Sequence, residues 1–313
     1  MHTIQWKTEG VYRGRFAPSP TGPLHLGSMF TALASFLQAR SRQGEWLLRI
    51  DDIDTPRVME GATGAIKRTL EDHALFWDGD IVMQSRKSHE YHSALRMLDA
   101  SGILYPCNCS RQTLRTMVSR SGKPSPYPGT CRMARISRRQ AHALRVVTRG
   151  ASITVDDKLQ GSRCFDIERE FGDFVVLRRD GIISYHLATV IDDWQAGVTE
   201  VLRGFDLLES TPLQMHLQKL LGLPSHTYSH VPIVADRLGI KLSKQNLAEA
   251  VDGKNASATL FLLLDLLKQS PPLALKGALP DEILAWAVPN WDISKLSGVS
   301  VLAVGGRTLA SPD

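Results

Sequence analysis

Apolar positions in the first fifty residues change their period twice. Residues 11–17 have the content of a short buried strand, and a turn rich in proline and glycine follows over residues 18–23. Apolar side chains then recur at helical spacing, at Leu26, Phe30, Leu33, Ala34 and Leu37. Gly44 ends this predicted helix, and residues 45–50 predict a second strand. Such a βαβ unit binds its ligands at the carboxyl ends of its strands.

The rest of the chain predicts the remaining parts of an α/β fold. Residues 58–77 and 89–101 have helical periodicity, whereas the following stretch, to residue 149, is rich in Pro, Gly, Ser and Arg and weakly periodic. Regular patterning then returns, and we interpret it as the second half of the sheet with its helices: residues 174–177, 182–191, 198–202, 212–221 and 227–234. A helical apolar block follows at residues 259–267.

This organisation predicts a Rossmann-type, doubly wound parallel sheet with an inserted small module and a short helical C-terminal region. We expect four segments. The first half of the catalytic domain spans residues 11–104, the inserted basic module 105–150, the second half of the catalytic domain 151–225, and a lysine-containing loop with the helical region 226–313. The composition shift near Cys107 marks the start of the inserted module.

Composition excludes two classes of protein. The 313 residues are 43% hydrophobic and 22% charged, which is typical of a globular chain and not of a disordered one. The first ten residues lack an apolar core of signal-peptide length, and no apolar run approaches the roughly 18 residues that a spanning helix needs. We therefore expect a cytoplasmic protein without a membrane partner.

The positive charge of the chain is concentrated in one segment. Residues 100–155 contain ten Lys or Arg residues and no Asp or Glu. The rest of the chain therefore has 27 of the 37 basic residues and all 32 acidic residues. A localised basic surface of this kind suits a polyanion such as RNA. The alternative is a solvated basic face without a special function.

Three of the four cysteines lie within this basic segment. Cys107, Cys109 and Cys131 form a thiolate set of the kind that Zn²⁺ prefers, with one ligand missing for tetrahedral coordination. His142 could supply that ligand, and three unrelated buried thiols are the alternative. Cys164 lies outside the set, and we expect it to be a buried small side chain.

Two loops carry residues suited to a nucleotide. The loop before the first helix ends in His25-Leu-Gly-Ser28, where His25 and the helix N-terminus can donate to phosphoryl oxygens and Gly27 leaves room for the nucleotide. The second loop, Lys241-Leu-Ser-Lys244, can bring two ammonium groups onto a polyphosphate and stabilise the charge of departing pyrophosphate. Each motif alone is weak, but together and in this order they are specific.

Together these motifs resemble the signature pair of the class I aminoacyl-tRNA synthetases. The surrounding residues, Arg15-Phe-Ala-Pro-Ser-Pro-Thr-Gly and Arg49-Ile-Asp-Asp-Ile-Asp-Thr-Pro-Arg57, are similar to the glutamyl and glutaminyl subgroup, and the similarity runs from about Tyr12 to about Asn246. The resemblance implies that ATP and an amino acid condense to an aminoacyl-adenylate before acyl transfer to RNA. It assigns the ATP site, with Mg²⁺ expected beside the nucleotide, to His25, Gly27, Ser28, Lys241, Ser243 and Lys244, of which His25 and the two lysines are catalytic.

The resemblance also implies a pocket for L-glutamate, whose two carboxylates and ammonium require a guanidinium, a carboxylate and hydrogen-bond donors. The matching positions are Arg15, Phe16, Ala17, Pro18, Ser19, Asp51, Tyr185 and Arg203. Asp51 would face the ammonium of glutamate. The family pattern has glutamate at that position, so the shorter side chain of this sequence puts the ammonium contact in doubt.

Within this subgroup the chain is similar to the glutamyl-Q tRNA(Asp) synthetases. In their zinc module a tyrosine four residues before the last cysteine is the fourth ligand, which implies one zinc per chain held by Cys107, Cys109, Tyr127 and Cys131. Fewer than 70 residues follow Lys244, too few for the anticodon-binding region of a full glutamyl-tRNA synthetase. The implied reaction is transfer of glutamate to queuosine in the anticodon of tRNA(Asp), and the implied state is a monomer.

Three alternatives remain open from the sequence. The first is a truncated enzyme that charges tRNA(Glu), and the second is a ligase of the same mechanism that acts on a small molecule. The third is a non-catalytic RNA-binding paralogue, against which the presence of His25, Lys241 and Lys244 argues.

Overall fold

The computed structural model describes residues 11–116, 126–134, 136–137, 142–236, 250–304 and 308–309. Its strands are β1 (Arg13–Phe16), β2 (Glu45–Ile50), β3 (Val82–Met83), β4 (Leu104–Cys107), β5 (Ala143–Val146), β6 (Ser152–Asp157), β7 (Gly161–Asp166), β8 (Val175–Leu177), β9 (Glu200–Gly204), β10 (Thr227–Val231), β11 (Ile233–Ala235), β12 (Val301–Ala303) and β13 (Thr308–Leu309). Its α-helices are α1 (Leu26–Ser41), α2 (Ala62–Asp72), α3 (Ser88–Ala100), α4 (Arg111–Thr116), α5 (Ile167–Glu170), α6 (Tyr185–Gln195), α7 (Ser210–Leu221), α8 (Ala256–Leu266) and α9 (Pro280–Ala287).

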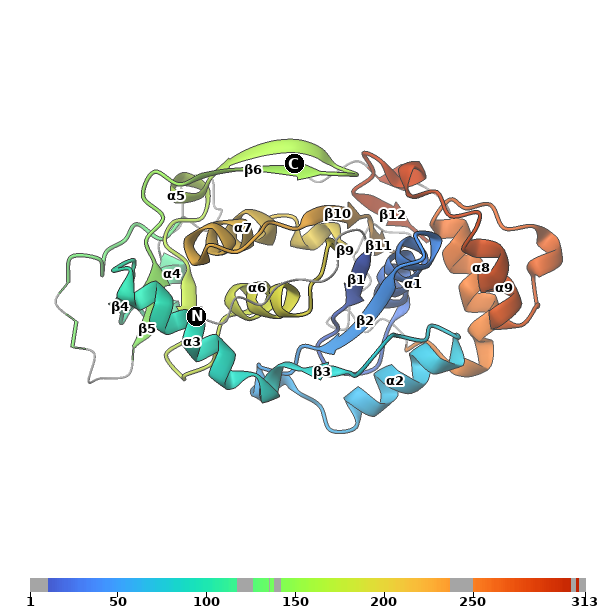
Figure 1. Ribbon diagram of the computed structural model, residues 1–313, viewed down its shortest axis with the longest axis horizontal. Coiled ribbons are helices and arrows are strands. Elements are labelled where there is room, and N and C mark those ends of the chain that lie inside the picture. The colour runs from blue at the N-terminus through green and yellow to red at the C-terminus, as the bar shows by residue number, and fades with distance from the viewer. Residues whose placement is uncertain are drawn as a thin grey trace.

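Two groups of parallel strands lie side by side at the centre of the molecule (Figure 1). In the first group β1 pairs with β2 and β2 with β3, all in parallel. In the second group β9 pairs with β10 and β10 with β6, also in parallel. β7 is the edge strand of the second group and pairs antiparallel with β6. β1 and β9 meet where the Thr199 amide donates to the Arg13 carbonyl at 2.9 Å. The strand order reverses at this seam, and such switch points are where open α/β sheets bind ligands.

Two apolar cores hold the helices against these strands. One core joins α1 and β2 to α8 and α9, and its largest side chain, Trp46, is fully buried and donates its indole N–H to Ser35 at 2.9 Å. The other core joins α3, α6 and α7 to the β6–β7 hairpin through residues such as Leu187, Leu217 and Phe165. Buried aromatic and aliphatic side chains fix both helix layers, so the ends of β1 and β9 have rigid surroundings.

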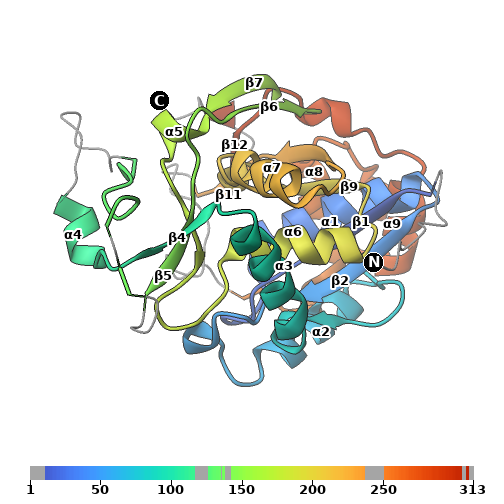
Figure 2. The same cartoon turned by 60° about the vertical axis from the view of Figure 1, so that its left-hand side comes forward.

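Three of the strands between α3 and α6 form a separate sheet. β4, β5 and β8 pair antiparallel in the order β4-β5-β8, and α4 follows β4. Figure 2 shows β4, β5 and α4 on one side of the molecule, away from α1 and β2. β8 therefore joins the inserted sheet to α6, which returns the chain to the central strands.

The predicted mostly parallel Rossmann-type fold is confirmed, with differences at particular elements. The helix expected over residues 58–77 is the shorter α2, because Gly61 before it and Ala74 after it adopt left-handed conformations with φ of 75° and 54°. The strand expected over residues 227–234 is two strands, β10 and β11, with Pro232 between them. The division of the chain into four segments stays a prediction.

One part of the fold was missed from the sequence, and one expectation was wrong. The β6–β7 hairpin lies in residues for which no element was predicted, and it extends the central sheet beside β10. Cys164 lies on β7 and is exposed, contrary to the prediction of a buried side chain. The reason is the strand register, since Cys164 points to the open face of the hairpin while its neighbour Phe165 is fully buried.

Candidate functional site

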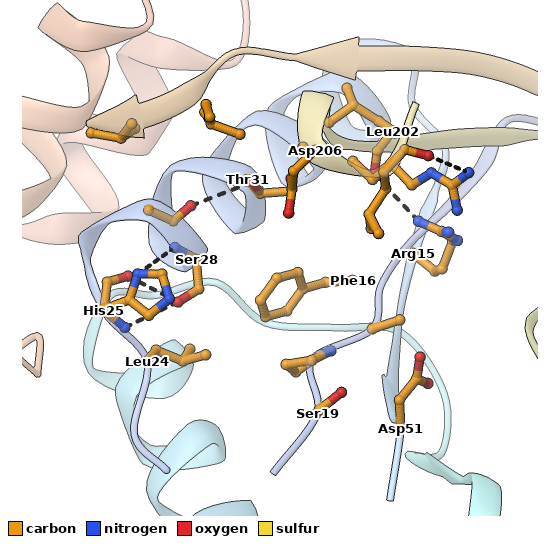
Figure 3. A pocket seen from close by; sticks show the side chains of 18 of the residues that line it. Arg15, Phe16, Ser19, Leu24, His25, Ser28, Thr31, Asp51, Leu202 and Asp206 are labelled. Atoms are coloured by element: carbon orange, nitrogen blue, oxygen red, sulfur yellow. Dashed lines mark hydrogen bonds between the residues drawn. The ribbon is translucent and has the colours of Figure 1, made fainter. Parts of the chain in front are cut away.

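A pocket of about 360 Å³ opens at the seam between β1 and β9. It brings together all the residues predicted for ATP and glutamate that lie in the described part of the chain: Arg15, Phe16, Ala17, Pro18, Ser19, His25, Gly27, Ser28, Asp51, Tyr185 and Arg203. Figure 3 shows His25 and Ser28 at one end of this pocket and Arg15 and Asp51 at the other. The pocket therefore has two chemically distinct ends.

The first end is the N-terminus of α1. His25 is the N-cap residue, and its Nδ1 accepts a hydrogen bond from the Ser28 amide at 3.3 Å, while Ser28 Oγ accepts from the His25 amide at 3.0 Å. Because Nδ1 is the acceptor, the proton of the neutral ring lies on Nε2. A 16-residue helix also presents its positive dipole end here. This end has the donors that a polyphosphate needs.

The second end contains a buried network of charges around α6. The Arg15 guanidinium donates to both carboxylate oxygens of Asp193, at 3.2 and 3.3 Å, and to the Leu202 carbonyl at 3.3 Å. Arg49 bridges Asp193 and Asp51, at 2.5 and 2.6 Å. All four side chains are buried, so each charge depends on its partners for solvation.

The two carboxylates of this network are held in different states. Burial opposes ionisation of both, but Arg15 and Arg49 together bring the pKa of Asp193 well below its usual range. For Asp51 burial outweighs the attraction of Arg49 and raises the pKa to about 6. At neutral pH both groups are therefore ionised, and Asp51 is the one that titrates near the physiological range.

A second chain of contacts holds Arg203, at the end of β9. Its Nη1 donates to the Tyr185 hydroxyl at 3.3 Å and its Nη2 to Thr211 Oγ1 at 2.8 Å, while its Nε donates to His230 Nε2 at 3.1 Å. His230 Nδ1 in turn lies 2.5 Å from Asp157 Oδ2. Since a guanidinium can only donate, His230 Nε2 must accept, and its ring proton lies on Nδ1 facing Asp157. Burial, which lowers the pKa of His230, favours the same neutral form.

Sequence reasoning missed the residues that support these arginines. Asp193 and its neighbour Asp192 are two consecutive carboxylates inside an otherwise apolar helix, which is a signal that could have indicated a buried role. Asp157 and His230 carried no such signal, because the hairpin that contains Asp157 was not predicted. Their pairing across β6 and β10 exists only in the folded chain.

Lys241, Ser243 and Lys244 lie outside the described residues. The described chain on either side of them borders the pocket. Val234, which precedes these lysines in the chain, lines the pocket. Ala250, which follows them, forms a β-bridge with His25. The neighbouring Val251 amide donates to the Leu24 carbonyl at 2.9 Å. The described residues on both sides of the predicted lysine loop therefore lie at the pocket, and those after the loop contact Leu24 and His25.

The three cysteines of the basic segment meet in the inserted module. The sulfur atoms of Cys107, Cys109 and Cys131 lie within 4.8 Å of one another. The Tyr127 hydroxyl lies 3.5 Å from Cys107 Sγ and 3.6 Å from Cys109 Sγ. His142 is also described but does not join the cluster. Burial raises the pKa of the Cys107 thiol, but its hydrogen bonds with Tyr127 and Arg145 outweigh burial and lower that pKa to about 7. A lower pKa favours the thiolate form, which is the form that a metal binds.

The described helices include none that is long and apolar enough to cross a membrane.

Comparison with known proteins gives the site a family context. Residues 12–268 match the catalytic domain of the class I tRNA synthetases (E and Q). The chain is 48% identical over 291 residues to the glutamyl-Q tRNA(Asp) synthetase of Thiobacillus denitrificans, covering 93% of this chain and 96% of that protein. It is 50% identical over 297 residues to the glutamyl-Q tRNA(Asp) synthetase of Methylococcus capsulatus, covering 94% and 96%.

A solved structure is similar in fold. The glutamate-tRNA synthetase from Elizabethkingia anophelis superposes with a TM-score of 0.78 at 23% sequence identity, covering 93% of this chain and 68% of that chain.

Proposed function

Because this chain belongs to the glutamyl-Q tRNA(Asp) synthetases, within the class I tRNA synthetases (E and Q), we propose that it activates L-glutamate with ATP and transfers it to queuosine in the anticodon of tRNA(Asp). In the first step the α-carboxylate of glutamate attacks the α-phosphorus of ATP, and pyrophosphate leaves. In the second step a hydroxyl of the modified base displaces AMP from the glutamyl-adenylate.

The observation that carries this proposal is the joining of two different ends in one pocket. The His25 end offers a helix N-terminus and an imidazole donor, and the other end offers two arginines, a tyrosine hydroxyl and a carboxylate. Glutamate fits the second end because Arg15 and Arg203 can bind its carboxylates while Asp51 accepts from its ammonium. ATP then lies along the first end, with its α-phosphate between the two.

The activation step depends on electrostatic stabilisation of the leaving pyrophosphate. We assign this role to His25 Nε2, Lys241 and Lys244, since the described residues flanking the lysine loop border the His25 end. Gly27, Ser28 and Ser243 complete the proposed ATP site, with Mg²⁺ on the polyphosphate. Arg15 and Arg49 hold the pKa of Asp193 well below its usual range, and Arg49 partly offsets the rise that burial causes in the pKa of Asp51, so the charges of the glutamate end are in place before the substrate arrives.

The inserted module has a donor set that fits one Zn²⁺. Tetrahedral zinc with bonds of about 2.3 Å to sulfur separates its thiolates by about 3.8 Å, a spacing compatible with the cysteine cluster. We propose Cys107, Cys109, Cys131 and Tyr127 as the ligands, since the Tyr127 hydroxyl lies 3.5 Å from Cys107 Sγ and 3.6 Å from Cys109 Sγ. Zinc would then tie β4 to the loop that contains Cys131 and stiffen the basic module that faces the RNA.

Glutamylation of defined tRNAs tests the proposal. Radiolabelled glutamate should accumulate on tRNA(Asp) from cells that make queuosine and not on queuosine-free tRNA(Asp). Equal labelling of both, or efficient labelling of tRNA(Glu), would contradict the proposed acceptor. Glutamate-dependent exchange of pyrophosphate into ATP tests the first step separately, and no exchange by pure, zinc-replete protein would favour the non-catalytic paralogue. The cytoplasmic location and the monomeric state stay predictions.

A further inference from the structure

A second cavity, also of about 360 Å³, adjoins the first pocket. Ser19, Asp51 and Tyr185 line both spaces. The remaining walls come from the chain after β2 and from the segment that runs from β8 into α6. Its size is within the range of small-molecule sites, about 300–1,000 Å³. The proposed function does not use this cavity.

The shared residues place the second cavity at the glutamate end. Figure 3 shows Ser19 and Asp51 away from His25 and Ser28, where the phosphates of ATP are proposed to lie. A molecule in the second cavity therefore lies beside the proposed glutamate site and away from the proposed phosphates of ATP. An acyl acceptor must come this close to the glutamate, because its oxygen attacks the activated carboxyl carbon.

The walls of the cavity suit a ring with uncharged hydroxyl groups. Phe174 and Ile182 supply apolar surface. The charges in the wall are paired, since Asp54 accepts from Arg178 at 3.1 Å and from Arg57 at 2.6 Å. His186 also lines the cavity, and its buried Nδ1 has no hydrogen-bond partner. Because the charged groups Asp54, Arg57 and Arg178 are paired with one another, the wall favours a ligand without net charge.

We propose that this cavity receives the acyl acceptor, a nucleotide group with vicinal hydroxyls on a five-membered ring. The proposal rests on the proposed function, which supplies the activated glutamate. Two parts of a tRNA have this chemistry, the cyclopentene-diol of queuosine and the ribose at the 3′ end.

The transfer step needs no further reactant. One hydroxyl oxygen of the acceptor forms an ester bond to the carbonyl carbon of the glutamyl-adenylate. The bond from that carbon to the phosphate oxygen breaks, and AMP leaves with the electron pair. The hydroxyl proton passes to the phosphate of AMP. The cavity contributes position, because it holds the hydroxyl next to the carbon that the first pocket holds.

The position of the cavity also links it to the basic segment. Val175 lines the cavity from β8, and its partner in the neighbouring strand is Arg145 of β5. The sheet that forms one wall therefore also carries part of the acid-free stretch 100–155. RNA phosphates held by that stretch would lie beside the entrance through which the acceptor ring must pass.

Filling the cavity tests the proposal. In Ile182→Trp protein the indole occupies space needed by the acceptor, and transfer from preformed glutamyl-adenylate to queuosine-containing tRNA(Asp) should slow about a hundredfold more than pyrophosphate exchange does. Leu273→Trp places the same side chain at a position that is 80% exposed and lines neither cavity, so both rates should match the wild type. Transfer by Ile182→Trp protein at the wild-type rate overturns the proposal.

Two further arms separate the possible outcomes. If Ile182→Trp slows pyrophosphate exchange as much as transfer, transfer is measured for the Arg178→Ala variant instead. Transfer by Arg178→Ala protein at the wild-type rate then overturns the proposal. The wild type is tested in parallel on queuosine-free tRNA(Asp) and on tRNA(Glu). If it transfers glutamate only to tRNA(Glu), the proposed function fails. The cavity proposal then stands, with ribose as the diol, provided that Ile182→Trp blocks that transfer.

Discussion

Two buried aspartates, Asp193 and Asp157, support the two arginines that we assign to glutamate. Asp193 contacts Arg15 directly, whereas Asp157 acts on Arg203 through the imidazole of His230. In both cases the carboxylate fixes a donor that would otherwise be mobile. The cost of ordering the guanidinium is met during folding and not during substrate binding.

The hydrogen bonds that connect Asp157 to Arg203 through His230 predict the effect of the substitution Asp157→Asn. In Asp157→Asn protein the amide N–H₂ can face His230 Nδ1, which moves the ring proton to Nε2 and sets it against the Nε–H of Arg203. Losing a hydrogen bond to a charged group costs about 1.5–3 kcal/mol, so the KM for glutamate should rise about 10-fold to 100-fold, with a smaller change for ATP.

Pyrophosphate exchange at varied glutamate and ATP measures both constants. The matched control is Asp156→Asn, since Asp156 is the exposed neighbour on the same strand. Equal changes of the KM for glutamate in Asp156→Asn and Asp157→Asn protein would contradict the role of Asp157 in holding Arg203.

Asp51 predicts a dependence of glutamate binding on pH. With its pKa raised to about 6 by burial, the carboxylate takes up a proton as the pH falls through 6 and loses its attraction for the ammonium. The KM for glutamate should therefore fall as the pH rises from 5 to 7. In Asp51→Asn protein the KM should be high and flat over this range; a wild-type KM without a step near pH 6 would contradict the assigned contact.

The same group affects stability with the opposite sign. An unfolded aspartate has a pKa of about 3.9, so the folded protein holds this proton more tightly than the unfolded chain. The contribution of Asp51 to folding therefore decreases as the pH rises from about 4 to about 6. The pH range that favours glutamate binding is thus the range in which this side chain destabilises the fold.

At the scale of elements, the inserted sheet β4-β5-β8 and its cysteine cluster form a unit with its own chemistry. Asp173, just before β8, ties together parts of this unit, because its carboxylate accepts from Arg132, from Tyr105 and from Thr148. Its pKa is lowered by these hydrogen bonds although burial opposes the shift. The loop with Cys131 is therefore anchored on one side by Asp173 and, as we propose, on the other side by zinc.

Metal analysis checks the proposed ligands. We expect one zinc per chain in the wild type and a loss of zinc in Cys107→Ser and Cys131→Ser protein, because a thiolate is removed from a four-ligand site. Cys164→Ser is the control, since Cys164 lies on β7 outside the cluster, and it should keep the metal. Elemental analysis of freshly purified protein gives the result, and an equal zinc content in Cys107→Ser and wild-type protein would refute the ligand set.

At the scale of the whole molecule, charge and catalysis are separated in space. The pocket that we propose for the reaction lies at the β1–β9 seam, whereas most of the acid-free basic stretch belongs to the inserted segment (Figure 2). RNA binding and amino-acid activation can therefore respond differently to the solution conditions.

Salt should distinguish the two activities. Each phosphate contact in a single strand contributes a slope of about −0.7 to the dependence of log affinity on log salt concentration. The KM for tRNA should therefore rise between 50 and 200 mM salt, by roughly tenfold or more if several phosphates are bound. Pyrophosphate exchange without tRNA should change much less. Arg149→Gln, at an exposed position of the basic stretch, should reduce the salt slope for transfer. Equal salt dependence of both activities would argue for a solvated face without RNA contact.

The sequence determined much of this protein by itself. The βαβ unit from β1 to β2 was predictable because each element depends on a local pattern, and β2 has the bounds that its apolar run predicts. Residues of the loop between Arg15 and Ser28 could be chosen as site residues because they match the motifs of the synthetase family, and the chosen ones line the pocket.

Only the tertiary structure decided which groups meet across the sheet. Asp157 lies 73 positions before His230, and Asp193 lies 178 positions after Arg15, so no local pattern links them. The second cavity likewise exists because β8 and the chain after β2 come together around Asp51. Periodicity reports which face of an element is buried, whereas contacts between distant elements depend on strand order and packing. The residues that line the pocket were therefore predictable, and the buried partners that hold them were not.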